Sequence, residues 1–156
     1  MIISRISGGI GNQLFQYAMG RALSLENKTE LKLDVHAYES EKHRSFELSS
    51  FDIKAVMARE SDFKTINVPN PAKKSFLAKV RRKSFRLFEK TKPFTKRRFV
   101  IEPKFTFYPH ALNSGPDAYL SGIWQSEKYF TKYEREIQED LILLGSPSFL
   151  FQNVLN

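Results

Sequence analysis

The chain has 156 residues, of which 41% are hydrophobic, 13% aromatic and 27% charged. This is the size of one ordinary domain, with enough apolar and aromatic side chains to build a core. The sequence has no cysteine, which excludes a disulfide scaffold, a cysteine-ligated zinc or iron–sulfur site and a thiol nucleophile. No stretch approaches the roughly 18 apolar residues of a membrane span, and residues 1–6 lack the basic leader of a secretory signal. We therefore expect a cytoplasmic protein.

The N-terminal part alternates between strand and helix patterns. The spacing predicts a strand over residues 2–7, a glycine turn over 8–11, a helix from Asn12 to about residue 26, and a second strand around 31–35. Asp34 and His36 stand at the far end of that second strand. Strand, turn, helix and strand in this order open a βαβ unit, so the sequence predicts an α/β fold with a parallel sheet.

The positive charge is concentrated in one segment. Twelve of the 25 Lys and Arg residues lie between Lys73 and Arg98 beside a single acid, Glu89, so this segment carries +11 and the rest of the chain −3. The spacing predicts an amphipathic helix within an insertion at about 72–98, and its apolar stripe consists of Leu77, Val80, Ser84, Leu87 and Phe88.

Three interpretations of this basic helix remain open. It is a solvated helix on the surface of the domain, or it lies on an anionic membrane, where each cation near the headgroups contributes roughly 1 kcal/mol. Alternatively, it contacts the phosphates of a nucleic acid or a nucleotide.

The C-terminal part repeats the alternation of strand and helix. We expect strands at residues 99–101 and 119–124, and a helix from the N-cap Ser126 through Leu141. Gly145-Ser146-Pro147 is expected to end that helix, and residues 148–156 to form another.

The glycine turn is the clearest candidate for a ligand site. It is neither a P-loop nor a complete dinucleotide fingerprint, because Leu14 occupies the place of the third glycine. Glycines let a ligand approach the backbone, and free N–H groups at the start of the following helix favour hydroxyl-rich or anionic ligands. Asn12 can donate and accept hydrogen bonds, as recognition of a sugar hydroxyl requires. The alternative is a tight strand-to-helix turn with Asn12 as the N-cap.

Other candidate groups are less specific. Trp124-Gln125 would form a second rim, because ligands of α/β sheets bind beyond the carboxyl ends of strands; the alternative is a core Trp with a surface Gln. Asp34 and His36 would form an acid–base pair or be two exposed neighbours. The three histidines lack metal-ligand spacing, so no metal site is expected.

Four stretches resemble the α-1,2-fucosyltransferases of glycosyltransferase family 11: residues 2–18, 33–35, 46–53 and 119–130. The resemblance runs from residue 1 to about 143. It implies the N-terminal half of a GT-B enzyme, which has two Rossmann-like domains. Such an enzyme transfers L-fucose from GDP-fucose to the 2-hydroxyl of a galactoside, with inversion and without a metal or other cofactor.

The resemblance also suggests roles for particular residues. It makes Asn12 the first candidate for contacting substrate, and we expect Gly9, Gly11, Gln13, Trp124 and Gln125 to contact it as well. An inverting transfer also needs a base for the acceptor proton, and Asp34 and Glu47 are the candidates. The family's His-x-Arg-Arg-x-Asp run, whose arginine neutralises the donor diphosphate, does not occur in this sequence.

We therefore expect an N-terminal fragment with little or no transferase activity, whose GDP-fucose site lies mainly in the other half. Its domain would span residues 1–145, and residues 146–156 would begin a linker or a second domain. We expect a peripheral membrane contact through residues 73–98 rather than binding to nucleic acid. The alternative function is a non-catalytic basic module that binds an anionic membrane or nucleic acid.

Overall fold

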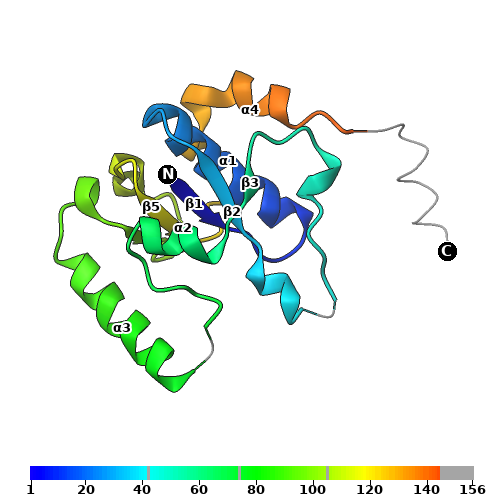
Figure 1. Ribbon diagram of the computed structural model, residues 1–156. Coiled ribbons are helices and arrows are strands. Elements are labelled where there is room, and N and C mark those ends of the chain that lie inside the picture. Colours follow the sequence, from blue (N-terminus) through cyan, green and yellow to red (C-terminus); the bar gives the residue numbers. More distant parts are fainter. Residues whose placement is uncertain (42, 74, 105, 145–156) are drawn as a thin grey trace.

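The structure is a computed structural model that describes residues 1–41, 43–73, 75–104 and 106–144. Its centre is a sheet of five parallel strands in the order β3-β2-β1-β5-β4 (Figure 1). The strands are β1 (Ile2–Arg5), β2 (Leu31–Asp34), β3 (Val56–Met57), β4 (Phe99–Ile101) and β5 (Ala118–Ser121). The predicted fold class is confirmed: the chain forms a Rossmann-like α/β domain.

Helix α1 (Ile10–Glu26) covers one face of the sheet. Its side chains Tyr17, Met19 and Leu23 belong to the same buried cluster as Ile2 and Leu33 of the strands. Gly20 lets the helix approach the sheet, because a Cβ there would lie 2.9 Å from side-chain atoms of both Leu31 and Ser4. The short helix α4 (Glu134–Asp140) packs on the outer side of α1 through Ile137.

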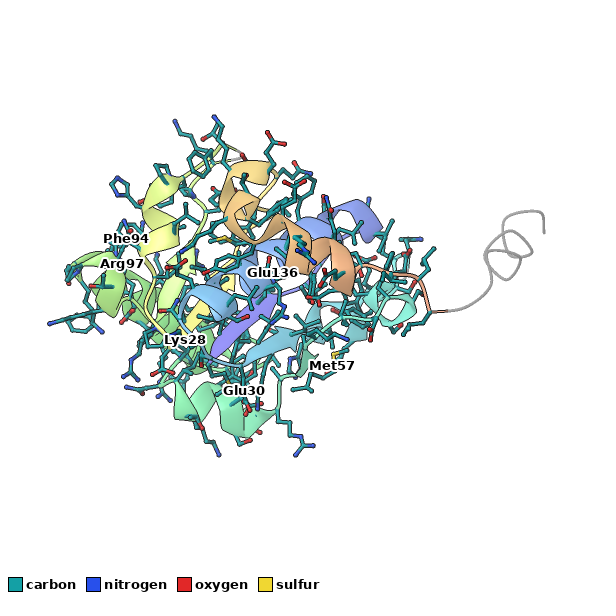
Figure 2. All side chains as sticks on the ribbon, turned by 90° about the horizontal axis from the view of Figure 1, so that it is seen from above. Lys28, Glu30, Met57, Phe94, Arg97 and Glu136 are labelled. Carbon is teal, nitrogen blue, oxygen red and sulfur yellow. The ribbon has the colours of Figure 1, made fainter. Side chains whose placement is uncertain are left out.

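The opposite face is covered by α2 (Glu60–Thr65) and by a group of aromatic rings. Phe63 of α2 and Phe99 of β4 both pack against Tyr119 of β5, with ring centroids 6.0 and 4.9 Å apart. The Lys32 ammonium of β2 lies 2.8 Å from the Asp62 carboxylate of α2 and joins the helix to the sheet. The edge strand β3 remains exposed, and Met57 lies at the margin of the molecule in Figure 2.

The basic segment forms the predicted helix, α3 (Phe76–Lys90), but the predicted apolar stripe does not face the domain. Leu77, Val80, Leu87 and Phe88 are exposed, and a different face turns inward, with Phe85 half-buried and Glu89 fully buried. The physical reason is a specific anchor: the Glu89 carboxylate accepts hydrogen bonds from the backbone N–H groups of Arg98 and Phe99.

The other predicted boundaries are also corrected. Helix α1 begins at Ile10 rather than Asn12, and β5 ends at Ser121 rather than Trp124. The helix predicted from Ser126 to Leu141 is broken near Phe130, whose φ of −138° is not helical. The remaining elements of the described residues are 3₁₀ turns: η1 (His36–Glu39), η2 (Leu48–Ser50), η3 (Phe94–Lys96), η4 (Pro109–Asn113), η5 (Glu127–Tyr129) and η6 (Thr131–Tyr133). The predicted stop at 145–147, the helix at 148–156 and the linker at 146–156 lie outside the described residues.

Candidate functional site

The glycine turn connects the end of β1 to the start of α1. Gly8 has a φ of +83°, and a Cβ at this position would lie 2.7 Å from Asn12 Nδ2, so only glycine fits without strain. Gly9 is the N-cap of α1, and Gly11 in the first turn is exposed. No side chain among the described residues caps this helix end, and its first turn has no acidic residue. Its amide N–H groups therefore remain available to a ligand at the surface.

Two buried glutamine side chains hold the turn. The Gln13 amide donates to the carbonyl oxygens of Gly8 (3.0 Å) and Ser45 (2.8 Å), and it accepts from the Glu47 N–H (2.9 Å). Gln16 accepts from the Ser7 N–H (2.8 Å) and donates to the Gly122 carbonyl oxygen (3.1 Å).

Gln13 was predicted to contact substrate, but its side chain is fully buried and serves to position the turn. Gln16 was missed by the sequence reasoning. Its position in the sequence gives one signal: the Gln16 side-chain amide lies on the core-facing side of the predicted helix, where a polar group needs hydrogen-bond partners.

Tyr38 adds a third support to the turn. Its hydroxyl donates to the Gly8 carbonyl oxygen at 2.7 Å. Burial, together with the negative charge of Glu47, raises the pKa of Tyr38 to about 12, so this hydroxyl keeps its proton at neutral pH.

The structure brings the two predicted rims together. Asn12 is the third residue of α1 rather than its N-cap, which leaves its side chain free to accept a hydrogen bond from Gln125 Nε2 at 3.0 Å. Gln125 follows β5, and Asn12 follows β1, its neighbour in the sheet. Strands β1 and β5 flank the topological switch point of the sheet, because β2 and β3 lie on one side of β1, whereas β5 and β4 lie on the other. Ligands of α/β folds bind at such a point.

Trp124 does not form part of an exposed rim. It is fully buried, has a φ of +61° and lies edge-on to Tyr129, with ring centroids 5.3 Å apart. Its backbone N–H and that of Ile123 donate to the Glu102 carboxylate at 2.9 and 2.8 Å. The alternative stated from sequence, a core tryptophan followed by a surface glutamine, describes what the structure shows. Trp124 therefore positions Gln125.

Asp34 and His36 form the pair that the sequence left undecided. The Asp34 carboxylate is buried; its Oδ1 lies 2.6 Å from His36 Nδ1, and its Oδ2 accepts the Tyr119 hydroxyl at 2.7 Å. Burial and the negative charge of Asp34 raise the pKa of Tyr119 well above its ordinary value, so the hydroxyl remains a donor. With both oxygens engaged, Asp34 holds His36 with Nδ1–H as the donor, so the lone pair lies on Nε2, which is 4.0 Å from a carboxylate oxygen of Glu39.

This imidazole lines a hollow of about 300 Å³ at the carboxyl ends of the strands. The buried residues Asp34 and Tyr119 line it, and so does Arg5, the last residue of β1. Arg82 and Arg86 enter it from α3. The Arg82 guanidinium bonds to the carbonyl oxygens of Asn70, Pro71 and Lys73, which fixes the loop that closes this side. The hollow thus combines a carboxylate-held histidine with several cations.

Glu47, the other predicted base, lies elsewhere. Its side chain is exposed beside the glycine turn, and Glu47 does not line the Asp34 hollow.

Within the described ranges, no three His, Asp or Glu side chains come together as a metal site. In that same part of the chain, no helix is long and apolar enough to cross a membrane.

The chain is similar to an alpha-1,2-colitosyltransferase of Escherichia coli, with 29% identity over 142 residues. The aligned region covers 89% of this chain and 44% of the relative, so the chain spans less than half of that protein's length. The protein that this chain resembles is thus a glycosyltransferase. No family model and no solved structure matches this chain.

Proposed function

We propose that this chain is the acceptor-binding part of an inverting glycosyltransferase that links a deoxy sugar to the 2-hydroxyl of a galactoside. One structural observation carries the proposal: a histidine held by a buried carboxylate lines a hollow at the carboxyl ends of the strands. The similarity to a colitosyltransferase supports glycosyl transfer as the reaction class. We further propose that the domain is one half of a GT-B arrangement and requires no metal.

In the proposed reaction, His36 is the general base. Its Nε2 takes the proton of the 2-hydroxyl while the hydroxyl oxygen attacks the anomeric carbon of the donor sugar. The bond from that carbon to the diphosphate oxygen breaks on the opposite face and its electrons leave with the nucleotide, which inverts the configuration. Asp34 is a positioning residue that sets the tautomer of His36 and stabilises its protonated form. A correctly placed general base accelerates such a step by roughly 10²- to 10⁴-fold.

The glycine turn has a different role in this proposal. Asn12 and Gln125 offer amide donors and acceptors to sugar hydroxyls, and the open N-terminus of α1 offers backbone N–H groups. Gly9 and Gly11 carry no side chain of their own, which lets the sugar approach the backbone, and the Arg44 guanidinium lies close to Gly9.

The donor is proposed to be a nucleotide-linked 6-deoxy sugar, with GDP-fucose as the first candidate. The relative's name introduces colitose as the second. Colitose is L-fucose without its 3-hydroxyl, so the two donors differ by one hydrogen-bonding group, which transfer assays with GDP-fucose and GDP-colitose would distinguish.

Acceptor binding is testable on the chain alone by saturation-transfer NMR. We expect methyl β-galactoside to bind with the strongest transfer at the proton on C2, and its 2-deoxy analogue to bind several-fold more weakly. The His36→Ala and Asn12→Ala variants should lose this signal, whereas His110→Ala, a substitution at an exposed histidine outside the hollow, should keep it. Equal binding of both sugars, or unchanged binding by His36→Ala and Asn12→Ala, would contradict the proposed site.

A further inference from the structure

Helix α3 carries a row of large apolar side chains on its outer surface. Phe76, Leu77, Val80, Leu87 and Phe88 are 77%, 78%, 47%, 69% and 60% exposed. At 100° per residue they fall within one continuous sector of the helix, which we call the outer stripe. Half of the large hydrophobic residues exposed on the described part of the chain lie on this one helix. A surface of this kind on a single element marks an interaction site.

Most of the outer stripe is turned away from the domain, and only Leu77 at its edge also lines a hollow with Phe63 of α2 among the described residues. The inward side of α3 is anchored by the buried Glu89 carboxylate and by Phe85, whose ring meets that of Phe99 edge-on at 6.5 Å. The neighbouring segment is held as well: the Arg97 guanidinium carbon lies 3.8 Å from the centre of the Phe94 ring, and the guanidinium donates to the carbonyl oxygens of Lys90 and Lys92. Figure 2 labels Phe94 and Arg97 close together. The helix is thus fixed to the body with its apolar side outward. In Figure 1, α3 lies apart from the sheet at the lower left.

Cations border the outer stripe on both sides. Lys79, Lys83 and Lys90 run along one edge and Arg81 lies on the other, all of them exposed. Among the described residues, no carboxylate forms an ion pair with any of these four; the one acid of the segment, Glu89, is buried and pairs with Lys92. The outer surface of α3 therefore combines hydrocarbon with uncompensated positive charge.

We propose that α3 binds an anionic lipid bilayer, lying in the plane of the surface with the outer stripe inserted and the flanking cations at the lipid phosphates. A helix of 15 residues is about 22 Å long, which suits an interfacial helix and is too short to span the hydrocarbon. The phosphates of a nucleic acid would bind the cations but would leave the five apolar side chains exposed to water. An acidic protein would need a matching apolar groove, whereas a bilayer supplies hydrocarbon and anionic headgroups together.

The test is co-sedimentation of the purified chain with vesicles. We expect binding to vesicles of phosphatidylglycerol and phosphatidylcholine, and much weaker binding to phosphatidylcholine alone. Leu77→Asp with Leu87→Asp should lower the partition coefficient by roughly tenfold or more, because each leucine loses its transfer from water into hydrocarbon. Ile142→Asp is the matched control, since Ile142 is 61% exposed at another place on the surface.

A second readout locates the inserted surface. The sequence has no cysteine, so Leu87→Cys can carry a single environment-sensitive fluorophore, with Ile142→Cys as its control. We expect a blue shift on addition of anionic vesicles for the label at position 87 only. Charge reversal at Lys79, Arg81 and Lys83 should remove the preference for anionic lipid, and reversal of the exposed Lys28 and Lys104 should not.

Several results would overturn the proposal. These are failure to bind anionic vesicles, binding that is unchanged by the leucine substitutions, and a label at position 87 that remains in water. Binding to an oligonucleotide that depends on the cations and ignores the leucines would assign α3 to nucleic acid instead. The substituted leucines are solvent-exposed, so circular dichroism should show the variants to be folded. None of these outcomes bears on sugar binding, so this proposal and the proposed function fail separately.

Discussion

At the scale of single residues, the hydrogen bonds of Asp34 decide what His36 can do. A free imidazole prefers the Nε2–H form, whereas an Asp34 oxygen at 2.6 Å selects Nδ1–H. We predict that ¹⁵N-correlated NMR shows the Nδ1–H tautomer in the wild type and mainly Nε2–H in Asp34→Ala. Tyr119→Phe removes only the other partner of Asp34 and should keep the wild-type tautomer, at a cost of about 1 kcal/mol in stability. A tautomer that does not respond to Asp34→Ala would remove the positioning role.

Two glycines of the turn form a matched pair of single-residue tests. Gly8→Ala places a Cβ at positive φ against Asn12 and should destabilise the fold by about 1–3 kcal/mol. At Gly11 a Cβ meets nothing within 4 Å and the residue is helical, so Gly11→Ala should be neutral or stabilising by up to about 1 kcal/mol. Urea unfolding measures the change in the free energy of unfolding for both variants. Equal effects at the two positions would show that the turn does not have this geometry.

At the scale of elements, Asp62 links α2 to the sheet. Burial opposes ionisation of its carboxyl, but hydrogen bonds from Lys32 and from the Arg59 N–H outweigh burial and lower its pKa. A lowered folded-state pKa means that the stabilisation is complete above the unfolded value near 3.9 and is lost as the pH falls through the folded value. Asp62→Asn should therefore lower the free energy of unfolding by about 1–2 kcal/mol at neutral pH and by progressively less below about pH 4. Urea unfolding of both proteins at a series of pH values measures this difference. A cost that does not change with pH would contradict the ion pair.

The buried Glu89 carboxylate is the main polar anchor of helix α3. Glu89→Leu would leave the N–H groups of Arg98 and Phe99 unpaired, at a cost of about 3 kcal/mol. We predict that this substitution frees α3 while the sheet persists, so that trypsin cleaves the basic segment much faster than in the wild type. Glu136→Gln on α4, a change at an exposed carboxylate, serves as the control (Figure 2). Unchanged cleavage of Glu89→Leu would show that other contacts hold the helix.

At the scale of the molecule, the carboxyl ends of the strands carry two groups of side chains with different chemistry. The α1 side ends in the glycine turn with Asn12 and Gln125, whereas the α2–α3 side ends in the hollow with His36 and the arginines. Both lie at the carboxyl ends of parallel strands, where this class of fold binds its ligands. The same helix that contributes Arg82 and Arg86 to the hollow turns its outer stripe to solvent. The proposed site and the proposed membrane surface are thus opposite sides of one helix.

We propose that this chain binds the acceptor and does not contain a complete site for the nucleotide-sugar donor, which gives a prediction for the chain as a whole. Purified protein incubated with GDP-fucose or GDP-colitose and lactose should give little or no glycosylated product by mass spectrometry. The reason is that Arg5 and Arg86 are single side chains rather than a preorganised bidentate clamp for a diphosphate. Robust turnover would show that this chain contains a complete donor site.

The sequence by itself determined the parallel α/β class, the glycine turn and the existence of a basic amphipathic helix. These are local properties, since periodicity and glycine conformations depend on neighbours a few residues apart. The tertiary structure alone decided that Gln13 and Trp124 are buried, that Asn12 meets Gln125, and that Asp34 joins His36 to Tyr119. It also turned the apolar side of α3 outward, because the buried Glu89 anchor lies on the other side of that helix. Such outcomes depend on which surfaces meet across the fold, and no local pattern encodes a contact between residues a hundred positions apart.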